Sequence, residues 1–149
     1  LNKPSESFNS IKNQVPSQGF FAVHVRGGDY LKINSSYVQL TSEYYKKAFS
    51  IVSETCGSLP VWVFTDDVDY AKQMLSSFSD LFYVDGKSTT AAEELKLMSM
   101  AKSIVCANST FSYWASVISD SASLIVAPNS WIKAHEQPRD FFPKGWKLI

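Results

Sequence analysis

The chain has 149 residues and 45% of them are hydrophobic, which is enough for one domain with a core of its own. Its 14 basic residues balance its 14 acidic ones, and no block of like charge stands out, so the sequence offers no electrostatic footprint for nucleic acid or anionic membrane. The longest apolar runs, residues 20–23 and 124–127, are far shorter than the roughly 20 residues that cross a bilayer, and no signal-peptide pattern opens the chain. A soluble protein is expected, in which a local site would hold any anionic ligand.

The first part of the chain, residues 1–19, is polar, contains two prolines and has no clear hydrophobic period, which is typical of a linker or an entry segment. The folded core is expected to begin near Phe20 and to make residues 20–149 one domain. Cys56 and Cys106 lack the paired spacing of a zinc or redox motif, so both are expected to be reduced thiols, with Cys106 in the core.

From Phe20 onward, short apolar runs typical of β-strands alternate with segments of helical period. The expected strands are residues 20–26, 61–65, 81–84, 103–107 and 124–127. The expected helices are residues 42–53, 68–78, 90–101 and 110–119. This alternation predicts an α/β fold, a parallel sheet with helices on both faces. Ligands of such sheets bind beyond the carboxyl ends of the strands, and polar residues gather after the first, second and fourth of these strands.

The first expected strand ends in the sequence His-Val-Arg-Gly-Gly-Asp. Strand alternation puts His24 and Arg26 on one face, so two donors converge at the strand end. An Arg guanidinium grips phosphate in bidentate fashion, and Gly27 and Gly28 let backbone amides approach the same anion without a Cβ in the way. The pattern therefore favours a diphosphate site. The alternative is a tight turn in which Arg26 pairs with Asp29.

The fourth expected strand runs through Asn-Ser-Thr into an apolar helix. The start of that helix presents backbone amides and hydroxyls, which suits a phosphate group. Plain N-capping by Asn108 or Ser109 explains the same residues, and capping and phosphate binding can coexist. Glu94 also lies near a helix start, where the helix dipole favours a carboxylate without any ligand.

Asp66 and Asp67, after the second expected strand, raise the question of a metal site. The favoured interpretation is that they cap the helix that begins near Val68, or organise the loops around a ligand. Tyr44 and Tyr45 are expected to pack in the core. Four aromatic residues near the C-terminus are expected to fold that tail back over the domain or over a partner domain: Trp131, Phe141, Phe142 and Trp146.

The segment from His24 to Tyr30 resembles the His-x-Arg-x-Gly-Asp-Tyr signature of family 11 α-1,2-fucosyltransferases and, more loosely, that of α-1,6- and protein O-fucosyltransferases. Further segments resemble family motifs in the same order: Thr-Asp-Asp at residues 65–67, Glu94 followed by Leu-Met-Ser at 97–99, Ala-Asn-Ser-Thr-Phe-Ser at 107–112, and Ala-Pro-x-x-Trp at 127–131. The sequence departs from the family at Gly27, where a second Arg is frequent, and at Tyr113, where Trp is usual.

The resemblance implies a Rossmann-like fold, the C-terminal donor-binding domain of a GT-B type glycosyltransferase. It implies that the diphosphate of GDP-fucose lies between Arg26 and the helix start at Ser109, and that Glu94 accepts hydrogen bonds from guanine, supported by His24. The implied donor-binding set is His24, Arg26, Gly27, Gly28, Glu94, Asn108, Ser109, Thr110 and Ser112. No metal and no cofactor besides this donor are expected.

The reaction implied by the resemblance is an inverting transfer of L-fucose from GDP-β-L-fucose to the 2-hydroxyl of a galactose-containing glycan. Arg26 is expected to stabilise the charge that grows on the β-phosphate. Asp29 is the nearest candidate for the general base, although bracing of the glycine turn is its favoured role. An acceptor-binding domain has no room in residues 1–19, so a partner domain is expected to supply that site.

Two alternatives stay open at this stage. One is a non-catalytic domain or fragment that binds GDP or GDP-fucose, and the other is an enzyme like the protein O-fucosyltransferases. Bacterial family members act in the cytoplasm on lipid-linked or free glycans, whereas animal members sit in the Golgi behind a membrane anchor. Since the sequence shows no anchor, a cytoplasmic place, peripheral to the membrane, is expected, with the Golgi lumen as the alternative for a chain that has lost its anchor.

Overall fold

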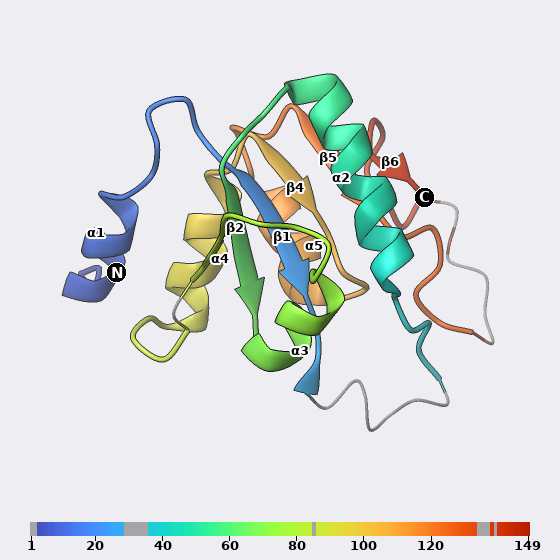
Figure 1. The fold of residues 1–149 in the computed structure, drawn as a ribbon, viewed down its shortest axis with the longest axis horizontal. Coiled ribbons are helices and arrows are strands. Elements are labelled where there is room, and N and C mark those ends of the chain that lie inside the picture. Colours follow the sequence, from blue (N-terminus) through green and yellow to red (C-terminus); the bar gives the residue numbers. More distant parts are fainter. Residues whose placement is uncertain (1–2, 29–35, 85, 134–137, 139) are drawn as a thin grey trace.

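The computed structural model describes residues 3–28, 36–84, 86–133, 138 and 140–149 of the chain (Figure 1). Asp29 and Tyr30, from the glycine-containing motif, lie outside the described residues. Within the described ranges, no helix is long and apolar enough to pass through a bilayer.

Six strands of the described chain form one sheet in the order β3-β2-β1-β4-β5-β6. Every neighbouring pair is parallel, which confirms the predicted parallel sheet. The central strand β1 is buried along its whole length, as its largely apolar sequence predicts, and the burial includes its one polar residue, His24. The strands are β1 (Phe21–Val25), β2 (Val61–Thr65), β3 (Leu81–Tyr83), β4 (Ser103–Val105), β5 (Leu124–Ala127) and β6 (Lys147–Leu148).

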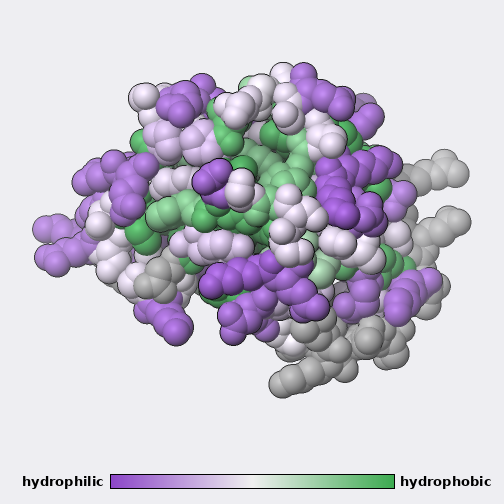
Figure 2. All heavy atoms as spheres, in the orientation of Figure 1, coloured by the Kyte–Doolittle hydropathy of each residue, from purple (hydrophilic) through white to green (hydrophobic). Residues whose placement is uncertain are grey.

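Helices cover both faces of this sheet (Figure 1). In the view of Figure 1, α2 and α3 lie in front of the strands and α4 and α5 lie behind them, with α1 beside α4. Figure 2 shows the front face, where hydrophobic residues gather near the centre and hydrophilic ones surround them. The helices are α1 (Glu6–Lys12), α2 (Ser42–Cys56), α3 (Val68–Met74), α4 (Ala91–Ser99) and α5 (Thr110–Val117).

Alternation along β1 sends side chains into two separate core layers. Phe21, Val23 and Val25 pack with residues of α2 and α3, among them the buried Tyr45. Ala22 points to the other face and packs with residues of α1, α4 and α5. The strand therefore divides the core, and the side chain that follows Ala22 on the same face, His24, belongs to the layer of α4 and α5.

The segment before β1 is not the linker that its polar composition predicted. It contains α1, which begins after the N-cap Ser5, whose side chain accepts a hydrogen bond from the backbone of Phe8. Phe8 and Ile11 lie three positions apart on one helix face and are buried in the core layer of α4 and α5. The core thus begins before Phe20. A helix of two turns shows too few apolar residues for a period to be visible in the sequence.

The C-terminal tail folds back over the domain, as expected from its aromatic residues. Trp131 is buried and its ring meets those of Tyr113, Phe141 and Phe142. The Tyr113 hydroxyl also donates a hydrogen bond to the carbonyl of Phe141, at 2.8 Å. The tail then adds β6, which the sequence analysis did not predict, to the sheet beside β5.

The expected core residues of this fold are in place. Tyr45 is buried, and its hydroxyl donates to the backbone carbonyl of His24. Tyr44 is half-buried and donates to the carbonyl of Cys106 at 2.6 Å. Cys56 and Cys106 are free thiols, and Cys106 is fully buried, which confirms both expectations.

Candidate functional site

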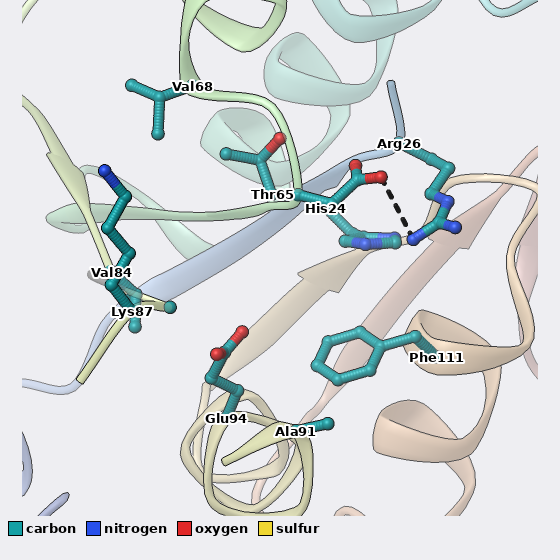
Figure 3. A pocket seen from close by; sticks show the side chains of 11 residues that line it. His24, Arg26, Thr65, Val68, Val84, Lys87, Ala91, Glu94 and Phe111 are labelled. Atoms are coloured by element: carbon teal, nitrogen blue, oxygen red, sulfur yellow. Dashed lines mark ion pairs between the residues drawn. The ribbon is translucent and has the colours of Figure 1, made fainter. Parts of the chain in front are cut away.

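A cavity of about 380 Å³ opens at the carboxyl ends of β1 and β2, on the side of the sheet that α4 and α5 cover (Figure 3). Three of its residues, His24, Arg26 and Glu94, were expected to bind a ligand, and the fold brings them together around one space. The full lining is His24, Arg26, Thr65, Asp66, Val68, Val84, Gly86, Lys87, Ala91, Glu94 and Phe111.

Arg26 forms an ion pair at the rim of the cavity with Asp66, which follows β2. Its Nη1 atom lies 3.1 Å from Oδ2 of Asp66, and the other carboxylate oxygen of Asp66 accepts a hydrogen bond from the backbone of Gly27 at 3.0 Å. Both charged side chains are about a quarter to a third exposed, at 27% and 30%, so the pair itself contributes only about 0–1 kcal/mol to stability. The ion pair instead orients the site, because the carboxylate of Asp66 fixes both the guanidinium of Arg26 and the turn that follows it.

The two glycines after Arg26 are required by their surroundings. Gly28 has a φ of +50°, and a Cβ at this position would lie 2.5 Å from Oδ2 of Asp66. A Cβ at Gly27 would lie 2.9 Å from both the Cβ of Asp67 and a ring carbon of Tyr70. The absence of a second Arg at position 27 therefore has a steric cause, since a side chain there needs α3 to move.

His24 is buried beside the cavity, with its ring 5.2 Å from that of Phe111. Burial, together with the nearby charge of Arg26, lowers the pKa of His24 from 6.5 to about 3. The ring is therefore neutral at physiological pH and offers one donor and one acceptor. Its buried Nδ1 atom has no hydrogen-bond partner among the described residues, a condition that water or a ligand usually relieves.

Glu94 lies in the first turn of α4, as expected, next to a glutamate with a different role. The neighbouring Glu93 completes a capping box with Thr90, and these backbone and side-chain hydrogen bonds, with one from Ser5, lower the pKa of Glu93 to about 2. Glu94 instead lines the cavity and accepts a hydrogen bond from the hydroxyl of Thr89 at 3.2 Å. A Cβ at Gly86 would lie 2.9 Å from Oε1 of Glu94, so the backbone of this glycine approaches the carboxylate closely.

Around the start of α5, two residues that were expected to bind the donor, Asn108 and Ser109, make hydrogen bonds within the protein. Ser109 is the N-cap of α5, which matches the capping interpretation, and Thr110 is exposed. The side chain of Asn108 donates to the backbone carbonyls of Val38 at 2.7 Å and Trp131 at 3.5 Å, so it holds two loops together. None of these residues is part of the cavity lining given by the described chain.

The side chain of Ser112 faces the interior of the protein. Its side chain is completely buried, and its hydroxyl lies 3.2 Å from the carbonyl oxygens of both Ala107 and Ser109. The first turn of α5 directs that hydroxyl into the protein in this structure, and the expected contact between Ser112 and a diphosphate stays a prediction. The preceding residue, Phe111, points into the cavity instead (Figure 3).

The two aspartates after β2 have separate structural partners. Asp67 is the N-cap of α3, and its side chain accepts from the backbone of Tyr70 at 3.0 Å, which confirms the capping interpretation. Asp66 holds Arg26 and Gly27 as described above. Within the part of the chain that the structure describes, no three His, Cys, Asp or Glu side chains gather into a group that could hold a metal ion.

Comparison with known proteins gives this cavity a context. The family model for glycosyl transferase family 11 matches residues 7–149. The chain belongs to glycosyl transferase family 11. Two relatives of this family 11 chain come from Escherichia coli. An α-1,2-colitosyltransferase is 29% identical over 138 residues, covering 86% of this chain and 47% of the relative. The O-antigen biosynthesis glycosyltransferase WbnK is 26% identical over 123 residues, covering 79% and 41%. The family 11 chain thus spans less than half the length of these relatives.

The fold has a counterpart among solved structures. A crystal structure of the fucosyltransferase NodZ from Bradyrhizobium is similar with a TM-score of 0.54, at 18% identity, over 79% of this chain and 41% of that one. A second NodZ structure is similar with a TM-score of 0.50. This likeness confirms the predicted Rossmann-like α/β fold of the GT-B type for the family 11 chain.

Several cavity residues of this family 11 chain were not predicted as site residues. Phe111 lies inside a motif that the sequence analysis used, but its neighbours on both sides were chosen for their hydroxyls. Gly86 and Lys87 follow β3 in a connection that carries no recognisable motif. Asp66 was seen only as a helix cap or loop residue. Asp29, the candidate general base, lies outside the described residues, so its role stays a prediction.

Proposed function

We propose that this chain is the donor-binding part of an α-1,2-fucosyltransferase, which holds GDP-β-L-fucose and transfers L-fucose to the 2-hydroxyl of a galactose-containing glycan. The observation that carries the proposal is the meeting of His24, Arg26 and Glu94 around one cavity at the carboxyl edge of the sheet. Membership of family 11 and a volume within the range of small-ligand sites support it.

The chemistry of the walls suits a guanosine diphosphate. Arg26 is the cation for the phosphate groups, and its five N–H donors are enough for Asp66 and a phosphate together. Glu94 offers two adjacent acceptors for the N1–H and the amine of guanine. Phe111, Val68 and Val84 add apolar surface to the cavity, against which a planar base can lie.

In the reaction that we propose, the 2-hydroxyl of the acceptor attacks C1 of fucose as the bond from C1 to the GDP oxygen breaks, with inversion at C1. Arg26, held in place by Asp66, stabilises the negative charge that develops on the β-phosphate. In this proposal the stabilisation of the leaving group takes the role that a metal ion has in other transferases. Asp29 remains the candidate for accepting the proton of the acceptor hydroxyl.

The acceptor site belongs, in this proposal, to the part of the enzyme that the chain does not span. The two curated relatives are covered only to 47% and 41% of their length. A galactoside acceptor, a cytoplasmic place near the membrane and independence of metal ions all remain predictions that follow from the family resemblance.

A related donor is the second candidate. One relative is an α-1,2-colitosyltransferase, so the sugar carried by the GDP group could be colitose in place of fucose. The nucleotide half of the site would be the same. A comparison of GDP-fucose with GDP-colitose therefore decides the sugar without changing the base and diphosphate assignments.

The first experiment is a calorimetric titration of the chain with GDP-fucose, GDP and UDP in the presence of EDTA. Guanine nucleotides should bind and UDP should not. Arg26→Ala should weaken the binding of GDP by about 1.5–3 kcal/mol, the range for a hydrogen bond to a charged group, which is about 10- to 150-fold. Lys46→Met is the control, since Lys46 pairs with Glu43 on α2 and is not part of the cavity lining. Equal binding of UDP and GDP, or an Arg26→Ala variant that binds GDP as the wild type does, would refute the donor site.

A further inference from the structure

We propose that Lys87 is a specificity-determining residue that reads the O6 and N7 acceptors of the guanine base. The inference rests on the proposed function, because it takes the cavity to hold a nucleoside diphosphate. It assigns a role to a residue that follows β3 and belongs to none of the family motifs found in the sequence.

Lys87 lies far from Arg26 and so from the proposed diphosphate position. Arg26 follows β1 and Lys87 follows β3, and β2 lies between these two strands in the sheet. Two strand spacings are about 10 Å, roughly the distance from the diphosphate of a nucleotide to the far edge of its base. Figure 3 shows Lys87 at the opposite end of the cavity from Arg26, with Glu94 between them. A base that reaches Glu94 therefore also comes within reach of Lys87.

The surroundings of Lys87 allow its aliphatic carbons to pack against the side of the cavity while its ammonium group faces the base. Val84 and Val68 line the same end of the cavity (Figure 3). The aliphatic part of a lysine packs well along such a surface, while its ammonium group stays at the polar opening. The ammonium carries three donors, so it can serve a partner in the chain and a ligand at once.

The hydrogen-bonding groups of Lys87 and Glu94 together match those of guanine but not those of adenine. Guanine has the acceptors O6 and N7 on one edge and N–H donors at N1 and at the 2-amine, whereas adenine has a donor amine at position 6. At position 6 the ammonium of Lys87 would meet an acceptor on guanine but an amine on adenine, while N7 is an acceptor on both bases. The carboxylate of Glu94 would meet donors on guanine but an acceptor nitrogen on adenine. A mismatch at both groups discriminates more strongly than either group alone.

The test is a titration of the wild-type chain and Lys87→Met with GDP, IDP, ADP and inorganic pyrophosphate. Met keeps the length and the apolar stem but removes the donors. We expect GDP to bind about 10-fold more weakly to the variant, as for the loss of one hydrogen bond to a charged group, and ADP to change less than two-fold. IDP lacks the 2-amine but keeps O6 and N7, so its binding should weaken as much as that of GDP.

Two control variants accompany the test. Lys87→Arg keeps donors at this position and should keep most of the preference for GDP over ADP. Lys72→Met removes an equal charge from a lysine that lies 5.9 Å from the ring of Tyr83 and is not part of the cavity lining, so it should leave the preference unchanged. Equal unfolding midpoints of all variants establish that the losses are local.

The possible failures are distinct. If Lys87→Met weakens GDP, ADP and pyrophosphate equally, Lys87 binds the phosphates and the inference is wrong. If the wild type prefers GDP and Lys87→Met keeps the same preference, Lys87 does not read the base, while the proposed function stands. If the wild type binds no guanine nucleotide, the proposed function fails first and the inference with it.

Discussion

At the residue scale, the environment of His24 makes its protonation part of the stability of the chain. Its pKa is about 3 in the folded chain and 6.5 without the fold, chiefly because it is buried and then because Arg26 is near. Between these values the unfolded chain binds a proton that the folded chain does not, so the free energy of unfolding falls as the pH falls below about 6.5. From pH 7 to pH 5, His24 alone should account for a loss of about 2 kcal/mol.

The measurement is urea unfolding of the wild type and His24→Gln at pH 7 and pH 5. The variant starts from a different stability, so the comparison concerns the change with pH and not the absolute value. The wild type should lose about 2 kcal/mol more than the variant over this interval. An equal loss in both chains would mean that His24 is protonated in the fold or that another group controls this pH range.

Gly86 offers a second test at this scale, because it is the backbone neighbour of Glu94. A methyl group in Gly86→Ala would lie 2.9 Å from Oε1 of Glu94 and should turn the carboxylate away from the base. The affinity for GDP should fall about 10-fold, the loss of one hydrogen bond to a charged group, and calorimetry measures it. In a Glu94→Ala background the same change should have little further effect. A full loss in that background would show that Gly86→Ala acts on the loop and not through Glu94.

At the element scale, the contribution of α1 to stability tests whether this helix belongs to the core. Phe8 is buried against α4 and its neighbours, so Phe8→Ala should lower the free energy of unfolding by about 3 kcal/mol. Asn9→Ala, on the exposed side of the same helix, is the matched control and should change stability little. Chemical denaturation followed by circular dichroism measures both. If Phe8→Ala is as stable as Asn9→Ala, α1 does not belong to the cooperative core.

The elements that could be predicted are those with enough residues to show a period. The bounds of β2 and β5 match the expected residues 61–65 and 124–127, because short apolar runs between polar turns leave little choice. Three of the four expected helices, α2, α3 and α5, begin at the expected residue, and α4 begins one residue later. α3 ends at Met74 and not at residue 78, since its last turn gives way to loop. β6 has two residues and is held by its neighbour β5 and by the folded tail, so nothing local marks it.

At the scale of the whole molecule, the position of the site could be predicted but the orientation of its side chains could not. Parallel strands bring their carboxyl ends to one edge, so the residues after β1 and β2 had to meet there. Which residue of α5 faces the cavity depends on the exact start of that helix. Phe111 lines the cavity and Ser112 is buried, although the two are adjacent, and only the packed structure separates them.

The contact between Gly27 and α3 also restricts how this site can change in evolution. Tyr70 belongs to the core layer of α2 and α3, yet its ring occupies the space that a side chain at position 27 would need. A mutation from Gly27 to Arg would therefore be harmful in the present background and acceptable only after the start of α3 had changed. The two positions are epistatic, and the constraint comes from a helix that packs on the opposite face of the sheet and whose first residue, Val68, also lines the cavity.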